Sequence, residues 1–175
     1  MGIGQVPAPL VEHVLPLVGE RFPGRVGVPV PEPLAVPTEA WSPGRRQYRA
    51  EVLLERLTRF QAGAERVVGL ADLDLFVPDL NFVFGLARPG GPAVVALARL
   101  RQEFWGAPHE QPLLLARTAK EVVHELGHAY GLAHCQEPAC VMRFSNTLAE
   151  TDQKRDQFGP VHRRQLERIL HAGVT

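Results

Sequence analysis

Residues 124–134 read HELGHAYGLAH, and this stretch carries most of the chemical information in the sequence. His124 and His128 are four residues apart, so on a helix their rings leave the same face, one turn apart. Two imidazoles in that arrangement can share one zinc ion. Glu125, next to the first histidine, is placed to take a proton from a water molecule at the metal.

His134 completes the set only if the helix ends early. In a continuous helix it would lie about 9 Å further along the axis than His128, too far to reach the same ion. Gly131 accepts the left-handed conformation that ends a helix and reverses the chain, so His134 can fold back. Three neutral imidazoles leave a fourth position open, which is typical of a catalytic zinc. We therefore predict a catalytic Zn²⁺ on these three histidines, with Glu125 as the general base.

The stretch resembles a known signature. HExxHxxGxxH followed by a methionine is typical of metzincins, and Met142 would be their Met-turn residue below the zinc. The continuation HCQEPACVM, residues 134–142, is more similar to the archaemetzincin family. That family places one cysteine directly after the third histidine and a second five positions later, here Cys135 and Cys140. The resemblance covers most of residues 45–168 and is weaker before the histidine motif.

This resemblance implies an α/β (α+β) fold of the metzincin type. Residues 1–175 would form a single domain with a twisted mixed β-sheet, a backing helix, an active-site helix and a Met-turn. The strand around residues 81–85 would border the cleft, where a peptide substrate pairs in extended conformation. The resemblance also implies a zinc-dependent peptidase acting on short peptides, and it leaves open whether cleavage starts from their N-termini. Phe144 replaces a zinc-binding tyrosine of some metzincins, so the metal and the backbone must stabilise the transition state.

The C-terminal part departs from the archaemetzincin pattern. That family completes a four-cysteine zinc site with Cys-x-x-Cys after a phenylalanine. With the alignment on Phe158, these two positions are Gly159 and His162 in this chain. A shift of one residue would give Pro160 and Arg163 instead, and neither is a zinc ligand.

A second, structural zinc on Cys135, Cys140 and His162 is therefore one ligand short of the usual four. Water, Asp156 or His171 could complete it. The alternative is that the two cysteines are buried reduced thiols or form a disulfide with each other.

Composition excludes several other functions. The chain has 175 residues, 19 basic and 19 acidic side chains and a formal net charge of zero, which disfavours nucleic acid as a partner. No apolar stretch is long enough to span a membrane. The first residues, MGIGQVPAPLVEH, lack the features of a secretory signal, so we expect a cytoplasmic protein. We also expect a monomer without a propeptide.

The periodicity of apolar residues predicts the order β-α-β-α-β-β-β-α-α. Strands are expected over residues 3–6, 25–30, 66–75, 81–87 and 93–100. Helices are expected from Pro9 to just before Pro23, over 45–60, from Pro112 to Tyr130, and over 161–171. Pro16 should kink or shorten the first helix.

A non-catalytic zinc protein is the alternative to an enzyme. Such a protein would bind peptides or protein partners by adding a strand to its sheet. Hydrolysis of a peptide library, compared between the unmodified protein and Glu125→Gln, distinguishes the two.

Overall fold

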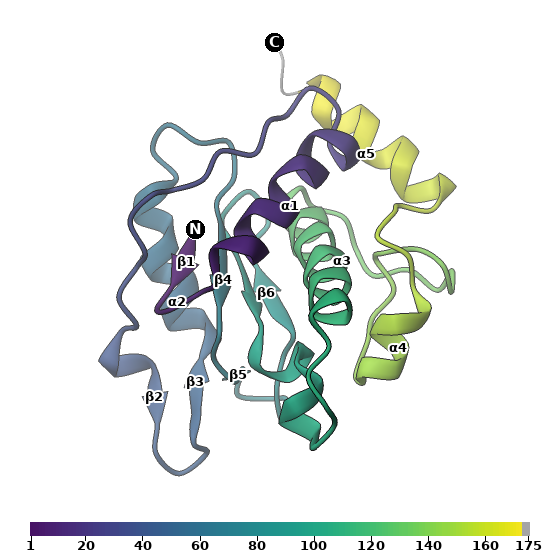
Figure 1. Ribbon diagram of the computed structural model, residues 1–175. Helices are drawn as coiled ribbons and strands as arrows, with labels where there is room; N and C mark the ends of the chain where they lie inside the picture. Colours follow the sequence, from purple (N-terminus) through teal and green to yellow (C-terminus); the bar gives the residue numbers. More distant parts are fainter. Residues whose placement is uncertain (173–175) are drawn as a thin grey trace.

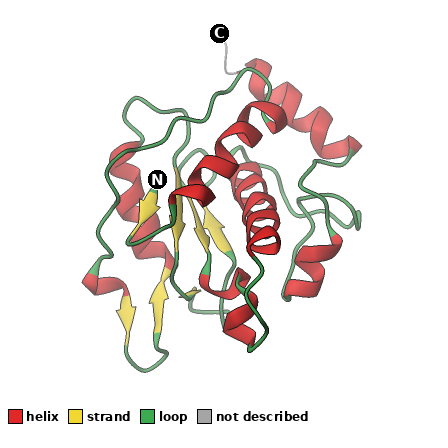
Figure 2. Ribbon diagram, in the orientation of Figure 1, coloured by secondary structure: helices red, strands yellow, loops and turns green. Residues whose placement is uncertain are grey.

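A central four-stranded sheet organises the fold (Figures 1 and 2). The computed structural model describes residues 1–172. The strands lie in the order β1 (Gly2–Ile3), β4 (Val68–Ala71), β7 (Ala93–Ala96) and β6 (Gly85–Ala87). The first three are parallel, and β6 is antiparallel at the edge. A smaller sheet joins β2 (Trp41–Ser42), β3 (Gln47–Arg49) and β5 (Leu75–Phe76).

Helices cover both faces of the central sheet. α1 (Ala8–Arg21) and α3 (Gln111–Ala129) lie side by side on one face, and α2 (Ala50–Leu57) lies on the other (Figure 1). α4 (Leu148–Gln153) and α5 (Pro160–Ala172) follow α3. Short 3₁₀ turns occupy Thr38–Ala40, Thr58–Phe60, Ala98–Leu100 and Gln102–Trp105. Within residues 1–172, no helix is long and apolar enough to cross a membrane.

Strand β7 shows why the sheet is buried on both sides. Val95 packs in the core beneath α1 and α3, whereas Val94 and Ala96 pack in the core beneath α2. Successive side chains of a strand point to opposite faces, so a strand covered on both faces must be apolar throughout. The continuous apolar run at residues 93–97 follows from this requirement. The predicted mixed α/β architecture is confirmed.

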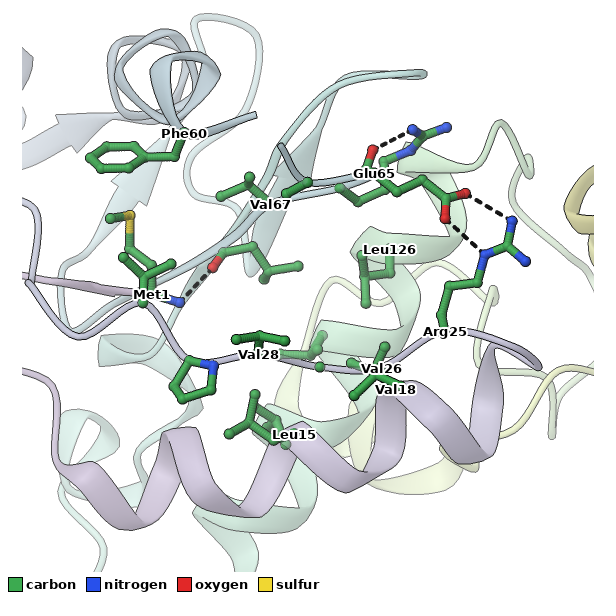
Figure 3. A pocket seen from close by; sticks show the side chains of 18 of the residues that line it. Met1, Leu15, Val18, Arg25, Val26, Val28, Phe60, Glu65, Val67 and Leu126 are labelled. Carbon is green, nitrogen blue, oxygen red and sulfur yellow. Dashed lines mark hydrogen bonds and ion pairs between the residues drawn. The ribbon is translucent and has the colours of Figure 1, made fainter. Parts of the chain in front are cut away.

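The predicted strand at residues 25–30 is wrong. This segment is an unpaired coil, and Val26 and Val28 are 84% and 75% exposed. The edge position beside β1 is taken instead by Leu34, which bridges to Ile3. The coil passes over a cavity of about 560 Å³ between α1 and β4, which Leu15 and Val67 help to line (Figure 3). The α-amino group of Met1 also lines this cavity and donates to the carbonyl of Val68 (2.9 Å).

Other predicted elements exist but with different bounds. The helix expected over 45–60 begins at Ala50, because residues 47–49 form β3. The strand expected over 66–75 divides into β4 and β5, and those over 81–87 and 93–100 shorten to β6 and β7. Asp72 and Asp74 lie between β4 and β5, where they pair with Arg101 and Arg99 instead of continuing the strand. Helix α1 continues through Pro16.

Helix α4 was not predicted from the sequence, and contacts with α3 hold it in place. Thr147 and Glu150 form a capping box at its start. Arg117 of α3 binds the Asp152 carboxylate through two nitrogens, at 2.8 and 2.6 Å. The Lys120 ammonium donates to the carbonyls of Thr151 and Asp152, each at 3.0 Å.

An ion pair directly after α4 is fully buried. The Lys154 ammonium lies 3.0 Å from the Glu121 carboxylate, and their side chains are 0% and 3% exposed. Lys154 also donates to the carbonyl of Arg143 (3.3 Å). Such a pair costs desolvation energy when it forms, but removing one partner leaves an uncompensated buried charge. It therefore fixes the segment after α4 against α3.

We predict that Lys154→Met destabilises the fold by about 3–5 kcal/mol, because Glu121 is then buried without a counter-charge. The double variant Lys154→Met/Glu121→Leu should lose much less, since no charge stays buried. Urea unfolding of the metal-free protein measures both. Arg88→Met is the control: its partner Glu55 is 70% exposed, so the loss should stay below about 1 kcal/mol. Equal losses in the single and double variants would contradict the interpretation.

Candidate metal centre

The candidate centre is built on the C-terminal half of α3. His124 and Glu125 are each 5% exposed, and Glu121 is 3% exposed one turn earlier. The helix passes beneath β6 and β7, so these polar side chains are held between the sheet and the chain that follows α3. Buried polar groups persist only when something satisfies them. This placement therefore calls for a partner at each of them.

Gly131 ends α3 as predicted. Its φ is +90°, its N–H donates to the carbonyl of His128 (2.8 Å), and the N–H of Leu132 donates to the carbonyl of Gly127 (2.9 Å). These bonds satisfy the last carbonyls of the helix and turn the chain back. The reversal carries His134 to the end of the helix that holds His128.

The three predicted histidines converge through their Nε2 atoms. His128 Nε2 lies 3.1 Å from His124 Nε2 and 3.2 Å from His134 Nε2. Two nitrogens bound to one tetrahedral zinc at about 2.0–2.1 Å are separated by about 3.3 Å. Both separations from His128 thus fit nitrogens that share one zinc ion, and the three ligand atoms all lie within 4.8 Å of one another.

Backbone carbonyls at the Nδ1 atoms of His124 and His128 determine which ring nitrogen carries the proton. His124 Nδ1 lies 2.7 Å from the carbonyl of Val141, and His128 Nδ1 lies 2.7 Å from the carbonyl of Leu132. A carbonyl only accepts, so both Nδ1 atoms carry the proton and the Nε2 atoms of neutral rings present lone pairs. Lone pairs that face each other need a cation between them. The donor set therefore fits a metal ion that binds imidazole.

Burial keeps these rings neutral. Desolvation is the main cause that lowers the pKa of His124, which falls well below its usual value, and of His128 and His134. The nearby Lys154 charge also lowers the pKa of each ring. Neutral imidazole is the form that binds metal.

Glu125 lies against the edge strand. A Cβ atom added to Gly85 of β6 would be 2.5 Å from Glu125 Cγ and Oε1, so only glycine lets the carboxyl approach this closely. Burial raises the pKa of Glu125 well above its usual value, and the nearby Glu121 carboxylate adds to the rise. A cation at the histidines would favour the ionised form. Glu125 thus has the surroundings of a group that exchanges a proton with a reactant.

Met142 packs against α3 within the histidine motif. It is fully buried, and a Cβ atom on Gly127 would overlap its sulfur and lie 3.2 Å from the ring of Phe158. Gly127 is the second variable position of the His-Glu-x-x-His stretch, and this contact explains why it has no side chain. The preceding residue, Val141, supplies the carbonyl that binds His124. Two consecutive residues thus contact α3: Met142 packs against Gly127, and Val141 orients the ring of His124.

A second cluster also assembles. Cys135 Sγ, Cys140 Sγ and one nitrogen of His162 all lie within 4.8 Å of one another. Both cysteines are free thiols, so the disulfide alternative is not observed. Cys140 Sγ lies 3.5 Å from His162 Nδ1 and accepts from the N–H of Gly159 (3.2 Å). Burial raises the pKa of the Cys140 thiol.

The alternative ligands proposed for this cluster are not part of it. The Asp156 carboxylate pairs with Arg21 at 2.8 Å. His171 is exposed on α5, nine residues after His162, and its Nδ1 lies 2.5 Å from the carbonyl of Glu167. Nine residues of helix span about 13 Å, so His171 cannot reach an ion bound by His162.

A cleft of about 550 Å³ opens over the three histidines. The edge strand β6 and the segment that precedes it form one wall, and the histidines, Glu125 and Phe144 form the other. The rings of Phe144 and His134 are 5.0 Å apart between centroids. The strand expected around residues 81–85 thus borders the cleft, although only Gly85–Ala87 are paired as β6.

Comparison with known proteins tests the family resemblance seen in the sequence. The family model described as peptidase family M54 matches residues 28–168. The archaemetzincin of Thermococcus kodakarensis is 40% identical over 174 residues, with 96% of this chain and 94% of the relative covered. The chain belongs to the archaemetzincin family. It is therefore a member of a family of zinc metallopeptidases, and the resemblance seen in the sequence is confirmed.

Solved structures support the archaemetzincin fold. The crystal structure of archaemetzincin from Methanopyrus kandleri has a TM-score of 0.82 and 37% identity, covering 98% of this chain and 96% of that one. The zinc-dependent peptidase from Methanocorpusculum labreanum has a TM-score of 0.85 and 30% identity, covering 94% and 98%.

Sequence reasoning missed three features of this archaemetzincin centre. The buried pair of Glu121 and Lys154 lies behind the histidines. Gly85 makes room for Glu125, and Glu137 lies beside Gly159. Of these residues, only Glu121 could be found from the sequence, because it lies three residues before His124 on the same helix. The other contacts depend on how distant segments fold together.

We predict that Gly127→Ala destabilises the fold by about 1–3 kcal/mol, because the added methyl overlaps the Met142 sulfur in a packed core. Thermal or urea unfolding of the metal-free protein measures the loss. Gly44→Ala is the matched control, because a Cβ there meets no atom within 4 Å and the change should stay within about 0.5 kcal/mol. Equal stability of Gly127→Ala and Gly44→Ala would show that the contact between Gly127 and the Met142 sulfur does not require glycine.

We also predict how metal retention depends on pH. Protons and metal compete for the same Nε2 atoms, and a lowered pKa moves the competition to lower pH. Metal content should therefore hold as pH falls to about 6.5, where an unperturbed histidine titrates, and decline only below it. Dialysis against a weak chelator at each pH measures this, with His134→Ala protein correcting for metal bound elsewhere. A decline that begins above about pH 7 would contradict it.

Proposed function

We propose that this chain hydrolyses peptide bonds, with zinc held by His124, His128 and His134 and with Glu125 as general base. One observation carries the proposal: the Nε2 atoms of three histidines converge beside a buried carboxyl group, in the lining of a cleft. Three neutral imidazoles with an open fourth position are typical of catalytic zinc sites. The family assignment supports the same chemistry.

The residues have distinct tasks in this proposal. Bound zinc would act as a Lewis acid toward the scissile carbonyl and lower the pKa of the attacking water. Glu125 accepts a proton from that water and delivers it to the leaving amine. Val141 and Leu132 hold two histidine rings in the tautomer that can bind the ion. Phe144 has no hydroxyl group, so it contributes packing against His134 and no hydrogen bond.

The edge strand is suited to orient an extended peptide. Ala96 of β7 donates to the carbonyl of Phe84, and Gly85 faces Val95 in the antiparallel register. Directly opposed residues alternate between hydrogen-bonded and non-bonded pairs, so the backbone groups of Gly85 and Ala87 point away from β7. They point toward the cleft side, where a substrate strand can pair with them.

The size of the cleft favours short substrates. A cleft of about 550 Å³ lies in the range of sites that enclose small ligands, which run from about 300 to about 1,000 Å³. We propose short peptides bound in extended form, and removal of N-terminal residues is one variant of this activity. Peptides with free and acetylated N-termini distinguish that variant from internal cleavage.

We propose a second ion with a structural role on Cys135, Cys140 and His162. Thiolate and imidazole are the usual ligands of structural zinc, and three such atoms already lie within 4.8 Å of one another. The ion would connect the segment after α3 to α5.

Glu125→Gln is the decisive variant. We expect it to lower peptide hydrolysis by about a hundredfold or more, because the amide cannot accept the proton. Zinc content should not change, because Glu125 is not a ligand. A peptide library analysed by mass spectrometry measures cleavage, and Glu12→Gln on the exposed side of α1 is the control.

Two results would contradict the proposal. Equal activity of Glu125→Gln and the unmodified protein would exclude Glu125 as the base. Binding of peptides without cleavage by the zinc-loaded unmodified protein would support the non-catalytic alternative.

A further inference from the structure

Position 159 shows how this chain could complete its second metal site. With the alignment on Phe158, Gly159 stands where the archaemetzincin pattern has a cysteine. Its backbone N–H donates to Cys140 Sγ (3.2 Å). Position 159 therefore adjoins the Cys135–Cys140–His162 cluster although it has no side chain. Three ligands are one fewer than a structural zinc site normally uses.

A carboxylate fills the space that a side chain at 159 would occupy. A Cβ atom built on Gly159 would overlap Glu137 Oε2 and lie 2.8 Å from Glu137 Cδ. The Glu137 carboxylate can take this position only because residue 159 has no side chain. We propose that Glu137 is the fourth ligand of the second metal site, in place of the missing cysteine. The inference rests on the second ion of the proposed function.

The position of Glu137 in the loop supports this role. Glu137 is two residues after Cys135, and its own N–H donates to Cys135 Sγ (3.4 Å). Its backbone is therefore tied to the cluster. Its carboxylate makes no hydrogen bond or ion pair within residues 1–172, so no other group competes for it.

The remaining step is a rotation of the Glu137 side chain. Its oxygens are not part of the group within 4.8 Å, so the carboxylate lies beside the cluster. Glu137 is exposed, and its side-chain torsions can change without disturbing the core. Attraction to a divalent cation favours the inward rotamer.

The ligand chemistry suits zinc. Zinc binds cysteine sulfur, histidine nitrogen and carboxylate oxygen in four-coordinate sites. Two thiolates, one neutral imidazole and one carboxylate bring three negative charges to a doubly positive ion. The same count of charge would result from three thiolates and one imidazole. Glu137 thus replaces the charge of a cysteine as well as its place.

Cobalt(II) substitution tests this assignment. Thiolate ligands give cobalt a sulfur-to-metal charge-transfer absorption in the near ultraviolet, and the three-histidine site contains no sulfur. The band therefore reports the second site alone, whether or not the protein hydrolyses peptides. A failure of the proposed peptidase activity and a failure of this assignment are thus distinguishable.

We expect Glu137→Gln to weaken cobalt binding at the thiolate site by about tenfold or more, measured by competition with a chromophoric chelator. Glu167→Gln, the same change on the exposed side of α5, should bind as the unmodified protein does. The double variant Glu137→Ala/Gly159→Cys exchanges the two ligands, since removal of the carboxylate makes room for the new side chain. It should recover tight binding and show a stronger band, because three thiolates replace two.

Two outcomes would overturn the proposal. Unchanged cobalt affinity in Glu137→Gln would show that water or no fourth ligand completes the site. Absence of a thiolate band in the reduced, unmodified protein would show that the cluster binds no metal at all.

Discussion

Two carbonyl groups, those of Val141 and Leu132, determine the chemistry of the three-histidine centre. Each accepts from an Nδ1 atom of a histidine ring and so leaves the Nε2 lone pair on the other side. Without these bonds, either ring could rotate or take the other tautomer, and the three nitrogens would not converge. Burial of the rings adds to the effect, since a charged imidazolium is costly to desolvate.

Close approaches to α3 require glycine at two positions, and both serve this centre. Gly127 leaves space for the sulfur of Met142, and Gly85 leaves space for the carboxyl of Glu125. Any larger side chain would move α3 away from the segment below it or from the edge strand. The distance between α3 and these two neighbours is therefore set by side chains that pack directly against glycine backbone.

The histidine cluster could be predicted from the sequence because local geometry places it. Helical spacing fixes His124 and His128, and Gly131 provides the turn that returns His134. Apolar runs likewise predicted the covered strands β4 and β7. Residues 25–30 misled the prediction because their alternation is that of a strand, whereas Leu34 takes the edge position beside β1.

Helix α4 and the position of Glu137 could not be predicted for a different reason. α4 is short, and its anchors are ion pairs with α3 from residues more than 30 positions away, such as Arg117. Glu137 meets Gly159 only after the segment between them has folded back. Nothing in the local pattern around either residue indicates this contact.

The segment from Cys135 to Met142 connects the three-histidine centre with the proposed second metal site. The N–H of Cys135 at the start of this segment donates to the carbonyl of Met142 at its end (3.0 Å). The carbonyl of Val141 orients the ring of His124. If both proposed ions bind, an ion on the cysteines that restrains this segment would also restrain the carbonyl that orients His124. Linkage is reciprocal, so any gain in affinity at one site would be matched by the same factor at the other. The affinities of the two ions would then not be independent constants, and each would depend on the free concentration at which the other is measured.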